Sequence, residues 1–119
     1  MTGAAVAPLP VTAIILTYNE EKNLSRCLDS IAGRVSEIVV VDSFSTDATL
    51  EIAGRFVHKV VQHRYDGHPQ QWHWALANVD LANEWVFAID ADFVVTEDVW
   101  TELRKRLAGG SDGVNGFYV

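Results

Sequence analysis

Clusters of polar side chains with potential for chemistry follow three apolar runs of this sequence. They are Thr17-Tyr18-Asn19-Glu20, Asp42-Ser43 and Asp90-Ala91-Asp92. Carboxylates can bind a hard divalent cation, and hydroxyl and amide groups can hydrogen-bond a polar ligand. Asp, Asn and Ser are also common turn residues, so one cluster alone does not establish a site. Three clusters, each placed after an apolar run, favour a binding function.

The strongest chemical candidate is the pair Asp90 and Asp92, which flank Ala91. If the backbone stays extended there, both carboxylates point the same way and can approach one cation. Two carboxylates leave coordination positions open for water and phosphate, which suits Mg²⁺ or Mn²⁺ bridging a diphosphate. An Asp-x-Asp pair is a weak signal by itself, but this one directly follows the apolar run 85–89. We predict Asp90 and Asp92 as metal ligands.

The composition limits the classes of ligand. The 119 residues carry a net charge of -7 with a pI near 4.8, which disfavours a nucleic-acid-binding surface. Neither a P-loop nor a dinucleotide-binding glycine motif follows the first apolar run. A phosphorylated ligand would therefore need a metal ion or backbone amides to offset the acidic charge.

The elements that would position these clusters alternate regularly along the chain. Apolar runs predict strands, and apolar side chains at helical spacing predict helices between them. The predicted strands are 11–16, 37–41, 56–61, 84–89 and 114–119. Four helices are predicted between them. The first surrounds Cys27 and ends near Gly33, the second is capped by Ser45 or Thr46 and ends near Gly54, the third covers 69–79, and the fourth is capped by Thr96. We expect an α/β fold with a mostly parallel sheet and helices on both faces.

In a sheet of this kind, ligands bind at the carboxyl ends of the strands. The three polar clusters all fall at such ends, so we expect them to meet in one crevice. We assign residues 1–10 to a flexible N-terminus and residues 11–119 to a single domain, with 109–113 as a turn.

Several other residues have competing interpretations. His58, His63, His68 and His73 recur every five residues, which turns helical side chains by about 140° and disfavours zinc. His68 and His73 remain candidates to line the crevice. Trp74 lies off the apolar stripe of its helix and is a candidate to stack on a ligand, while Gln70 and Gln71 fit a ligand contact or a solvated helix start equally. Cys27, in the series Leu24, Cys27, Leu28 and Ile31, is predicted to be a buried structural thiol.

Three motifs resemble the family 2 glycosyltransferases. They are Ile14-Ile15-Leu16-Thr17-Tyr18-Asn19-Glu20-Glu21, Val39-Val40-Val41-Asp42-Ser43-Phe44-Ser45-Thr46-Asp47 and Ile89-Asp90-Ala91-Asp92. The chain is most similar to the branch that includes bacterial lipopolysaccharide-core β-glucosyltransferases. The resemblance implies the GT-A fold, which contains a Rossmann-like half, and an inverting transfer from a nucleotide-sugar, with a UDP-sugar favoured, to a glycan or lipid-linked acceptor in cell-envelope synthesis.

The resemblance also implies roles for individual residues. Tyr18 would lie near the base, Glu20 near the ribose, and Asp42 would accept a hydrogen bond from uracil N3. Asp90 would face the ribose and sugar, and Asp92 would coordinate the metal. The full set expected at the nucleotide is Thr17, Tyr18, Asn19, Glu20, Asp42, Ser43, Gln71, Asp90 and Ala91, with Asp90 and Asp92 at a divalent cation.

Two residues depart from the family's pattern. Phe44 stands where Gly is usual, and Phe93 stands where this branch usually has Glu. The general base and the acceptor site are expected in a further segment beyond Val119, so we expect the chain alone to bind a donor and turn over poorly. An alternative is a non-catalytic nucleotide-binding or assembly fragment that needs a separate C-terminal half. A receiver-like signalling module is disfavoured, because the first strand does not end in an acidic pair.

The sequence contains no stretch suited to spanning a bilayer. The longest uncharged segment, 3–19, holds Pro8 and Pro10 and falls short of the roughly 20 apolar residues required. A single cysteine fits a reducing compartment. We therefore predict a cytoplasmic protein, with attachment to the inner face of the membrane left open.

Overall fold

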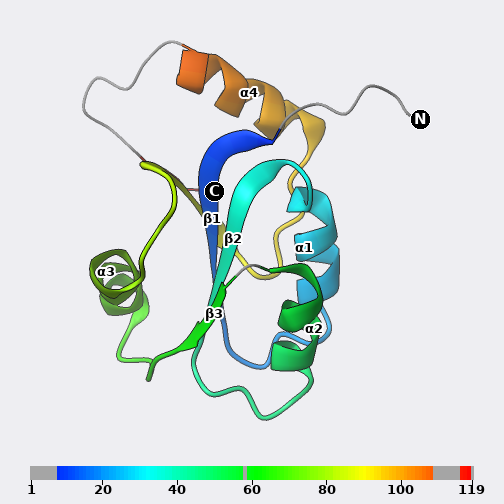
Figure 1. The fold of residues 1–119 in the computed structure, drawn as a ribbon. Coiled ribbons are helices and arrows are strands. Elements are labelled where there is room, and N and C mark those ends of the chain that lie inside the picture. The colour runs from blue at the N-terminus through cyan, green and yellow to red at the C-terminus, as the bar shows by residue number, and fades with distance from the viewer. Residues whose placement is uncertain (1–7, 58, 109–115, 119) are drawn as a thin grey trace.

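The computed structural model describes residues 8–57, 59–108 and 116–118 and has one central parallel sheet (Figure 1). The sheet contains five strands in the order β3-β2-β1-β4-β5. The elements are β1 (Leu9–Thr17), α1 (Leu24–Ile31), β2 (Val35–Asp42), α2 (Thr49–Phe56), β3 (Lys59–Gln62), α3 (His68–Asn78), β4 (Trp85–Asp90), α4 (Glu97–Ala108) and β5 (Gly116–Tyr118). The predicted α/β class and its alternation of strands and helices are confirmed.

Strand register brings the predicted polar clusters to one edge of the sheet. Thr17 at the end of β1 pairs with Asp42 at the end of β2, and Leu16 pairs with Asp90 at the end of β4. The three strands therefore finish side by side at the lower edge of the sheet in Figure 1. The predicted convergence of these strand ends is confirmed, and it follows from the parallel topology.

Helices cover both faces of the sheet, as expected. In Figure 1, α1 and α2 lie on one side and α3 lies on the other. Side chains of β1 alternate between two cores: Ile15 packs in a cluster with residues of α1 and α4, and Ile14 packs in a cluster with Ala75 of α3. This alternation is the period-two pattern of a strand buried on both faces.

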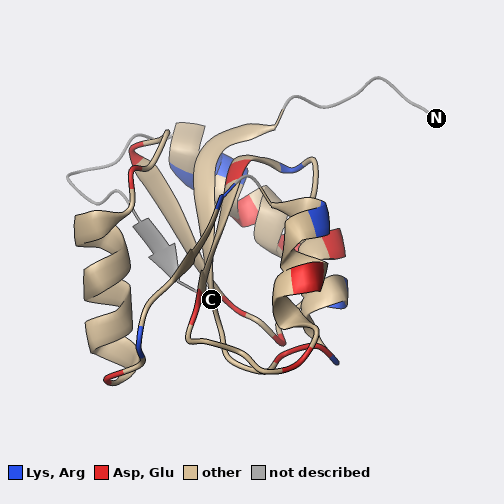
Figure 2. Cartoon of the chain, turned by 60° about the horizontal axis from the view of Figure 1, so that its bottom comes forward, with Lys and Arg blue, Asp and Glu red and all other residues tan. Residues whose placement is uncertain are grey.

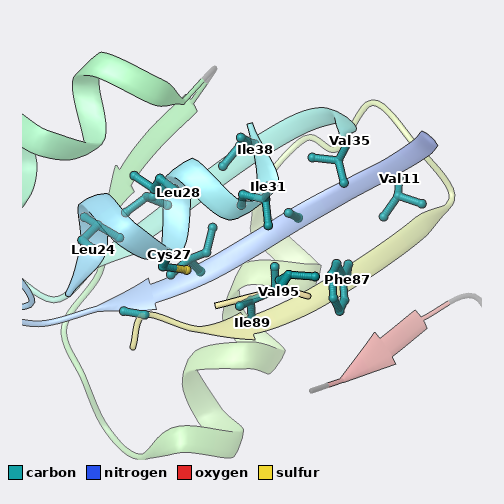
Figure 3. Close-up of a cluster of buried hydrophobic side chains, with 14 of the residues drawn as sticks. Val11, Leu24, Cys27, Leu28, Ile31, Val35, Ile38, Phe87, Ile89 and Val95 are labelled. Carbon is teal, nitrogen blue, oxygen red and sulfur yellow. The ribbon is translucent and has the colours of Figure 1, made fainter. Parts of the chain in front are cut away.

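The larger core is built on the apolar stripe of α1, which Figure 3 shows lying over β1. Leu24, Cys27, Leu28 and Ile31 are each 0% exposed, as their spacing predicts. Burial, followed by the nearby Asp92, Asp90 and Glu20 carboxylates, raises the pKa of the Cys27 thiol to about 12. Cys27 is therefore a packing residue that stays protonated at neutral pH, which confirms the prediction.

Some predicted boundaries are wrong. The helix expected after residue 45 begins at Thr49, and neither Ser45 nor Thr46 caps it, because Ser45 Oγ accepts the Asn19 N–H and Thr46 Oγ1 donates to Asn19 Oδ1. Phe56 ends that helix instead of opening β3. β1 begins at Leu9, inside the segment predicted to be flexible. The predictions for residues 1–7, 58, 109–115 and 119 lie outside the described residues.

Candidate functional site

A cleft with a volume of about 390 Å³ lies at the carboxyl ends of the strands. Its lining residues come from the last residues of β1 and β4, the segments after β1, β2, β3 and β4, and the first residue of α3. They are Leu16, Thr17, Tyr18, Glu20, Ser43, Tyr65, His68, Asp90, Ala91 and Asp92. Most of the residues predicted at the nucleotide therefore share one cavity, although Asn19, Asp42 and Gln71 do not line it.

Asp90 and Asp92 both line the cleft, but not through the geometry expected for them. β4 ends at Asp90, and the Phe93 N–H donates to the Asp90 carbonyl over 3.0 Å, which closes a turn through Ala91. The assumption of an extended backbone is therefore wrong. The turn still leaves Asp90 half-buried and Asp92 exposed at the same cavity, with Ala91 buried beneath them.

The donor set of the cleft suits a hard divalent cation. Glu20, Asp90 and Asp92 all line the cleft, and no Lys or Arg is among the described lining residues. Figure 2 shows Asp and Glu segments, in red, around the end of the sheet where the strands finish. Within the described ranges, no group of three His, Cys, Asp or Glu side chains is arranged to hold a metal. Two carboxylates that share a Mg²⁺ or Mn²⁺ with water and phosphate fit what is present.

Asp42 is buried below the cleft and fully engaged by protein donors. Its Oδ1 accepts from Thr17 Oγ1 over 2.7 Å and from Ser45 Oγ over 2.6 Å. Its Oδ2 accepts from the Ser45 N–H over 2.8 Å and from Gln62 Nε2 over 3.3 Å. With 0% exposure, Asp42 joins the ends of β1, β2 and β3 beneath the cavity.

Asn19 ties the loop after β1 to the loop after β2. It adopts the left-handed conformation at φ 51°, which Asn tolerates better than most residues. Its N–H donates to Ser45 Oγ over 2.8 Å, and its Oδ1 accepts from the Thr46 N–H over 2.8 Å. The Glu20 N–H then donates to Thr49 Oγ1 over 2.9 Å. These bonds fix the backbone on both sides of Asn19 and so position Tyr18 and Glu20.

Phe44 occupies a backbone conformation that favours glycine. Its φ is 62°, and its side chain is 55% exposed. The turn after β2 therefore keeps a left-handed residue at the position where the family pattern has Gly. An L side chain there costs about 1–2 kcal/mol, so the departure changes the stability of the turn more than its shape.

Gln71 lies beneath the cleft and holds two loops together. It is 1% exposed, its Nε2 donates to Ser43 Oγ over 3.0 Å and to the His63 carbonyl over 3.2 Å, and its Oε1 lies 2.8 Å from His63 Nδ1. Of the two interpretations weighed for Gln71, the solvated helix start is wrong, because the side chain is buried. Gln70 is exposed and does not line the cavity.

The histidines and Trp74 have separate surroundings. His68 lines the cleft and accepts the Trp72 indole N–H at Nε2 over 2.8 Å, whereas His73 is exposed and does not line it, so the expectation for His73 is wrong. The His63 ring stacks on Trp74 with centroids 4.0 Å apart. Trp74 therefore stacks on a protein side chain, and it is not among the described residues that line the cleft.

Tyr65 lines the cleft and was not expected there. It belongs to the polar segment between β3 and α3, which the sequence marks only as a loop. An aromatic residue within a polar stretch directly after a strand end is the signal that could have identified it.

The sequence matches Glycosyl transferase family 2 over residues 12–119. This chain belongs to that family. A relative, the lipopolysaccharide core biosynthesis glycosyltransferase LpsC of Rhizobium meliloti, is 32% identical over 96% of this chain and 43% of its own length. The family match decides against the receiver-like alternative and confirms the resemblance.

Two solved structures share the fold. One is that of S. aureus TarS 1-349, with a TM-score of 0.68 and 27% identity over 85% of this chain and 33% of that one. The other is glucosyl-3-phosphoglycerate synthase from Mycobacterium tuberculosis in complex with Mn²⁺, UDP and glucosyl-3-phosphoglycerate, with a TM-score of 0.66 and 25% identity over 84% and 40% of the two chains. Both support the GT-A assignment of this family 2 domain.

The chain spans 34% of the length of the first curated relatives that it matches. Within the described residues, none of the helices has the length and apolar character needed to cross a membrane.

Proposed function

We propose that this family 2 domain binds the donor of an inverting glycosyl transfer, a UDP-sugar with a divalent cation. The observation that carries the proposal is the single cleft that joins Tyr18, Glu20, Asp90 and Asp92 at the carboxyl edge of the sheet. An aromatic ring, acceptors for ribose hydroxyls and carboxylates for a metal are the groups that a nucleoside diphosphate requires.

Each part of the ligand would meet a different part of the cleft. Tyr18, 57% exposed at the cavity wall, offers a ring face to the base, and Glu20 offers a carboxylate to the ribose hydroxyls. Asp90 would face the ribose and sugar, and Asp92 would coordinate Mg²⁺ or Mn²⁺. When bound, the cation neutralises charge on the departing nucleoside diphosphate.

Three other residues predicted to contact the nucleotide support the cleft indirectly in this proposal. Asp42, Asn19 and Gln71 have hydrogen-bond partners within the protein and do not line the cleft, so we place them as positioning residues. Asp42 supports the strand ends, Asn19 fixes the loop that carries Tyr18, and Gln71 holds Ser43 at the cavity. The bound base would then be selected by groups at the cavity surface.

The transfer itself would displace the diphosphate at the anomeric carbon by an acceptor hydroxyl, with inversion. A general base must remove the hydroxyl proton. We propose a glycan or lipid-linked acceptor in envelope synthesis, which is supported by the name of the relative LpsC.

Calorimetric titration with UDP tests the proposal. We expect the chain to bind UDP in the presence of Mn²⁺ and to lose that binding when EDTA removes the cation. Asp92→Ala should weaken the Mn²⁺-dependent binding at least tenfold, about 1.4 kcal/mol, because it removes a metal ligand.

Asp29→Ala is the matched control. Asp29 is an exposed acid of α1 that does not line the cleft, so its loss changes the net charge equally without touching the site. Equal UDP affinity in wild type and Asp92→Ala, or the absence of binding by folded wild-type protein, would contradict the proposal.

A further inference from the structure

A second cavity, of about 420 Å³, adjoins the cleft, and neither Asp90 nor Asp92 is among its described lining residues. The described residues that line it are Tyr18, Ser43 and Tyr65, and all three also line the first cleft. The two cavities are therefore neighbours that share these three residues. The second is bordered by two tyrosines from loops far apart in the sequence, after β1 and after β3.

Tyr65 is held over this cavity without packing into the core. It is 53% exposed and belongs to neither buried cluster. Its segment is anchored on both sides: the His63 N–H donates to the Asp42 carbonyl over 2.9 Å, and the Gln71 N–H donates to the Gly67 carbonyl over 3.0 Å. The fold thus fixes the backbone around Tyr65 while leaving its ring half open to solvent.

The anchoring is reinforced by side chains that line neither cavity. Gln71, itself 1% exposed, bonds the His63 ring and carbonyl, and Trp74 stacks on the same ring at 4.0 Å. This network limits the movement of the residue two positions before Tyr65. An aromatic ring presented in this way is suited to contact a planar ligand.

We propose that Tyr65 is a nucleobase-binding residue, and that the base of the donor lies between Tyr18 and Tyr65. The inference rests on the proposed function, because it assigns the second cavity to the base of the same nucleotide whose diphosphate lies at Asp92. Stacking depends on the ring and not on the phenol oxygen. Tyr65 should therefore strengthen binding of ligands that carry a base and leave binding of the diphosphate alone unchanged.

The test compares UDP and inorganic pyrophosphate, each with Mn²⁺, by calorimetry. Tyr65→Ala should weaken UDP binding about tenfold, the effect of one lost base–aromatic stack. Tyr65→Phe should bind UDP within about twofold of wild type, since it keeps the ring. Pyrophosphate, which has no base, should bind wild type and Tyr65→Ala equally.

Leu76→Ala is the matched control, because Leu76 is 54% exposed on α3 and lines neither cavity. It should bind UDP as wild type does, and thermal unfolding should show that Tyr65→Ala is folded. If wild type binds UDP and Tyr65→Ala binds it equally, the inference is wrong and the proposed function stands. A loss of pyrophosphate binding in Tyr65→Ala, or a loss of UDP binding in Tyr65→Phe, would also overturn it. If folded wild type binds no UDP, the proposed function fails and the inference fails with it.

Discussion

Toward each end of the sheet, β1 and β2 are joined by a hydrogen bond from a threonine hydroxyl to a buried carboxylate. At the carboxyl end, Thr17 Oγ1 donates to Asp42 Oδ1 over 2.7 Å; at the amino end, Thr12 Oγ1 donates to Glu37 Oε1 over 2.7 Å. Both are register pairs of β1 and β2, and both carboxylates are buried, Asp42 at 0% and Glu37 at 8% exposure. One pair lies beneath the candidate site, and the other lies far from it.

The difference between the ends is what the carboxylate holds in place. Asp42 accepts hydrogen bonds from the hydroxyl and the N–H of Ser45, in the loop after β2 that borders the cleft. Glu37 accepts the Ala82 N–H over 2.9 Å, in the segment between α3 and β4. Each of these two buried acids therefore hydrogen-bonds a neighbouring loop, and only the loop bonded by Asp42 borders the cleft. Asp42 can therefore influence the shape of the cleft through the Ser45 loop without lining it.

Removal of each carboxylate gives the largest expected effect. Asp42→Ala leaves the Thr17 hydroxyl, two Ser45 donors and the Gln62 amide without their acceptor, so we expect the free energy of unfolding to fall by about 3–5 kcal/mol. Glu37→Ala leaves the Thr12 hydroxyl and the Ala82 N–H without their acceptor, and we expect the free energy of unfolding to fall by about 2–3 kcal/mol. Urea denaturation measures both.

UDP binding then separates the two ends. It should fall in the Asp42 variant, whose loop borders the cleft, and be unchanged in Glu37→Ala; Asp42→Asn replaces Asp42→Ala if the latter does not fold. An equal loss of UDP affinity in the Glu37 variant would break the comparison, because it would mean that the amino end also shapes the site.

One asparagine at each end of the sheet joins a loop to a neighbouring segment by hydrogen bonds: Asn19 at the carboxyl end and Asn83 at the amino end. We expect substitution of Asn19 to lower the free energy of unfolding more than substitution of Asn83. Asn19→Ala removes the acceptor of the Thr46 N–H and places Ala at a left-handed position, so we expect a loss of about 1–2 kcal/mol in unfolding free energy. Asn83 Nδ2 donates to Thr12 Oγ1 over 3.1 Å and to Ser36 Oγ over 2.7 Å, and Asn83→Ala should cost about 1 kcal/mol.

Amide hydrogen exchange checks the local effect. The Thr46 amide should exchange faster in Asn19→Ala and at the wild-type rate in Asn83→Ala. Asn19→Gly keeps the left-handed conformation without the side chain. If its Thr46 amide stays protected, the side-chain bond is not what holds the loop.

The comparison also shows how much could be predicted from the sequence. The alternation of elements and the meeting of Thr17, Ser43 and Asp90 at one edge follow from apolar runs and parallel topology, which are visible in the sequence. The sequence does not show whether a polar or aromatic side chain is buried against the protein or exposed at the cleft. Asp42 and Gln71 are buried and bond neighbouring loops, whereas Tyr65 is half exposed. Those choices depend on partners that folding brings together, such as Ser45 for Asp42 and His63 for Gln71.

The helix boundary after β2 was mispredicted for the same reason. Ser45 and Thr46 are good capping residues by type, yet their side-chain hydroxyls bond Asp42 and Asn19 instead. The helix then begins at Thr49, after the loop has completed these bonds. A long-range partner thus overrides a local preference at the position where the site is built.

The smallest expected effects concern the two left-handed residues that bracket β2. Gly33, at φ 78°, precedes the strand at the amino end, and Phe44, at φ 62°, follows it at the cleft. An added Cβ at Gly33 would meet no atom within 4 Å, so Gly33→Ala should cost about 1 kcal/mol through backbone conformation alone.

Phe44→Gly should act in the opposite direction. Relief of the left-handed strain, about 1–2 kcal/mol, exceeds the added freedom of the unfolded chain, about 0.4–1 kcal/mol, so a net gain of about 0.5 kcal/mol is expected. Thermal and urea unfolding of both variants measure the two signs. A loss of stability in Phe44→Gly would mean that the 55% exposed ring contributes packing that outweighs its strained backbone, and the two ends of β2 would then differ in side-chain contacts as well as in backbone conformation.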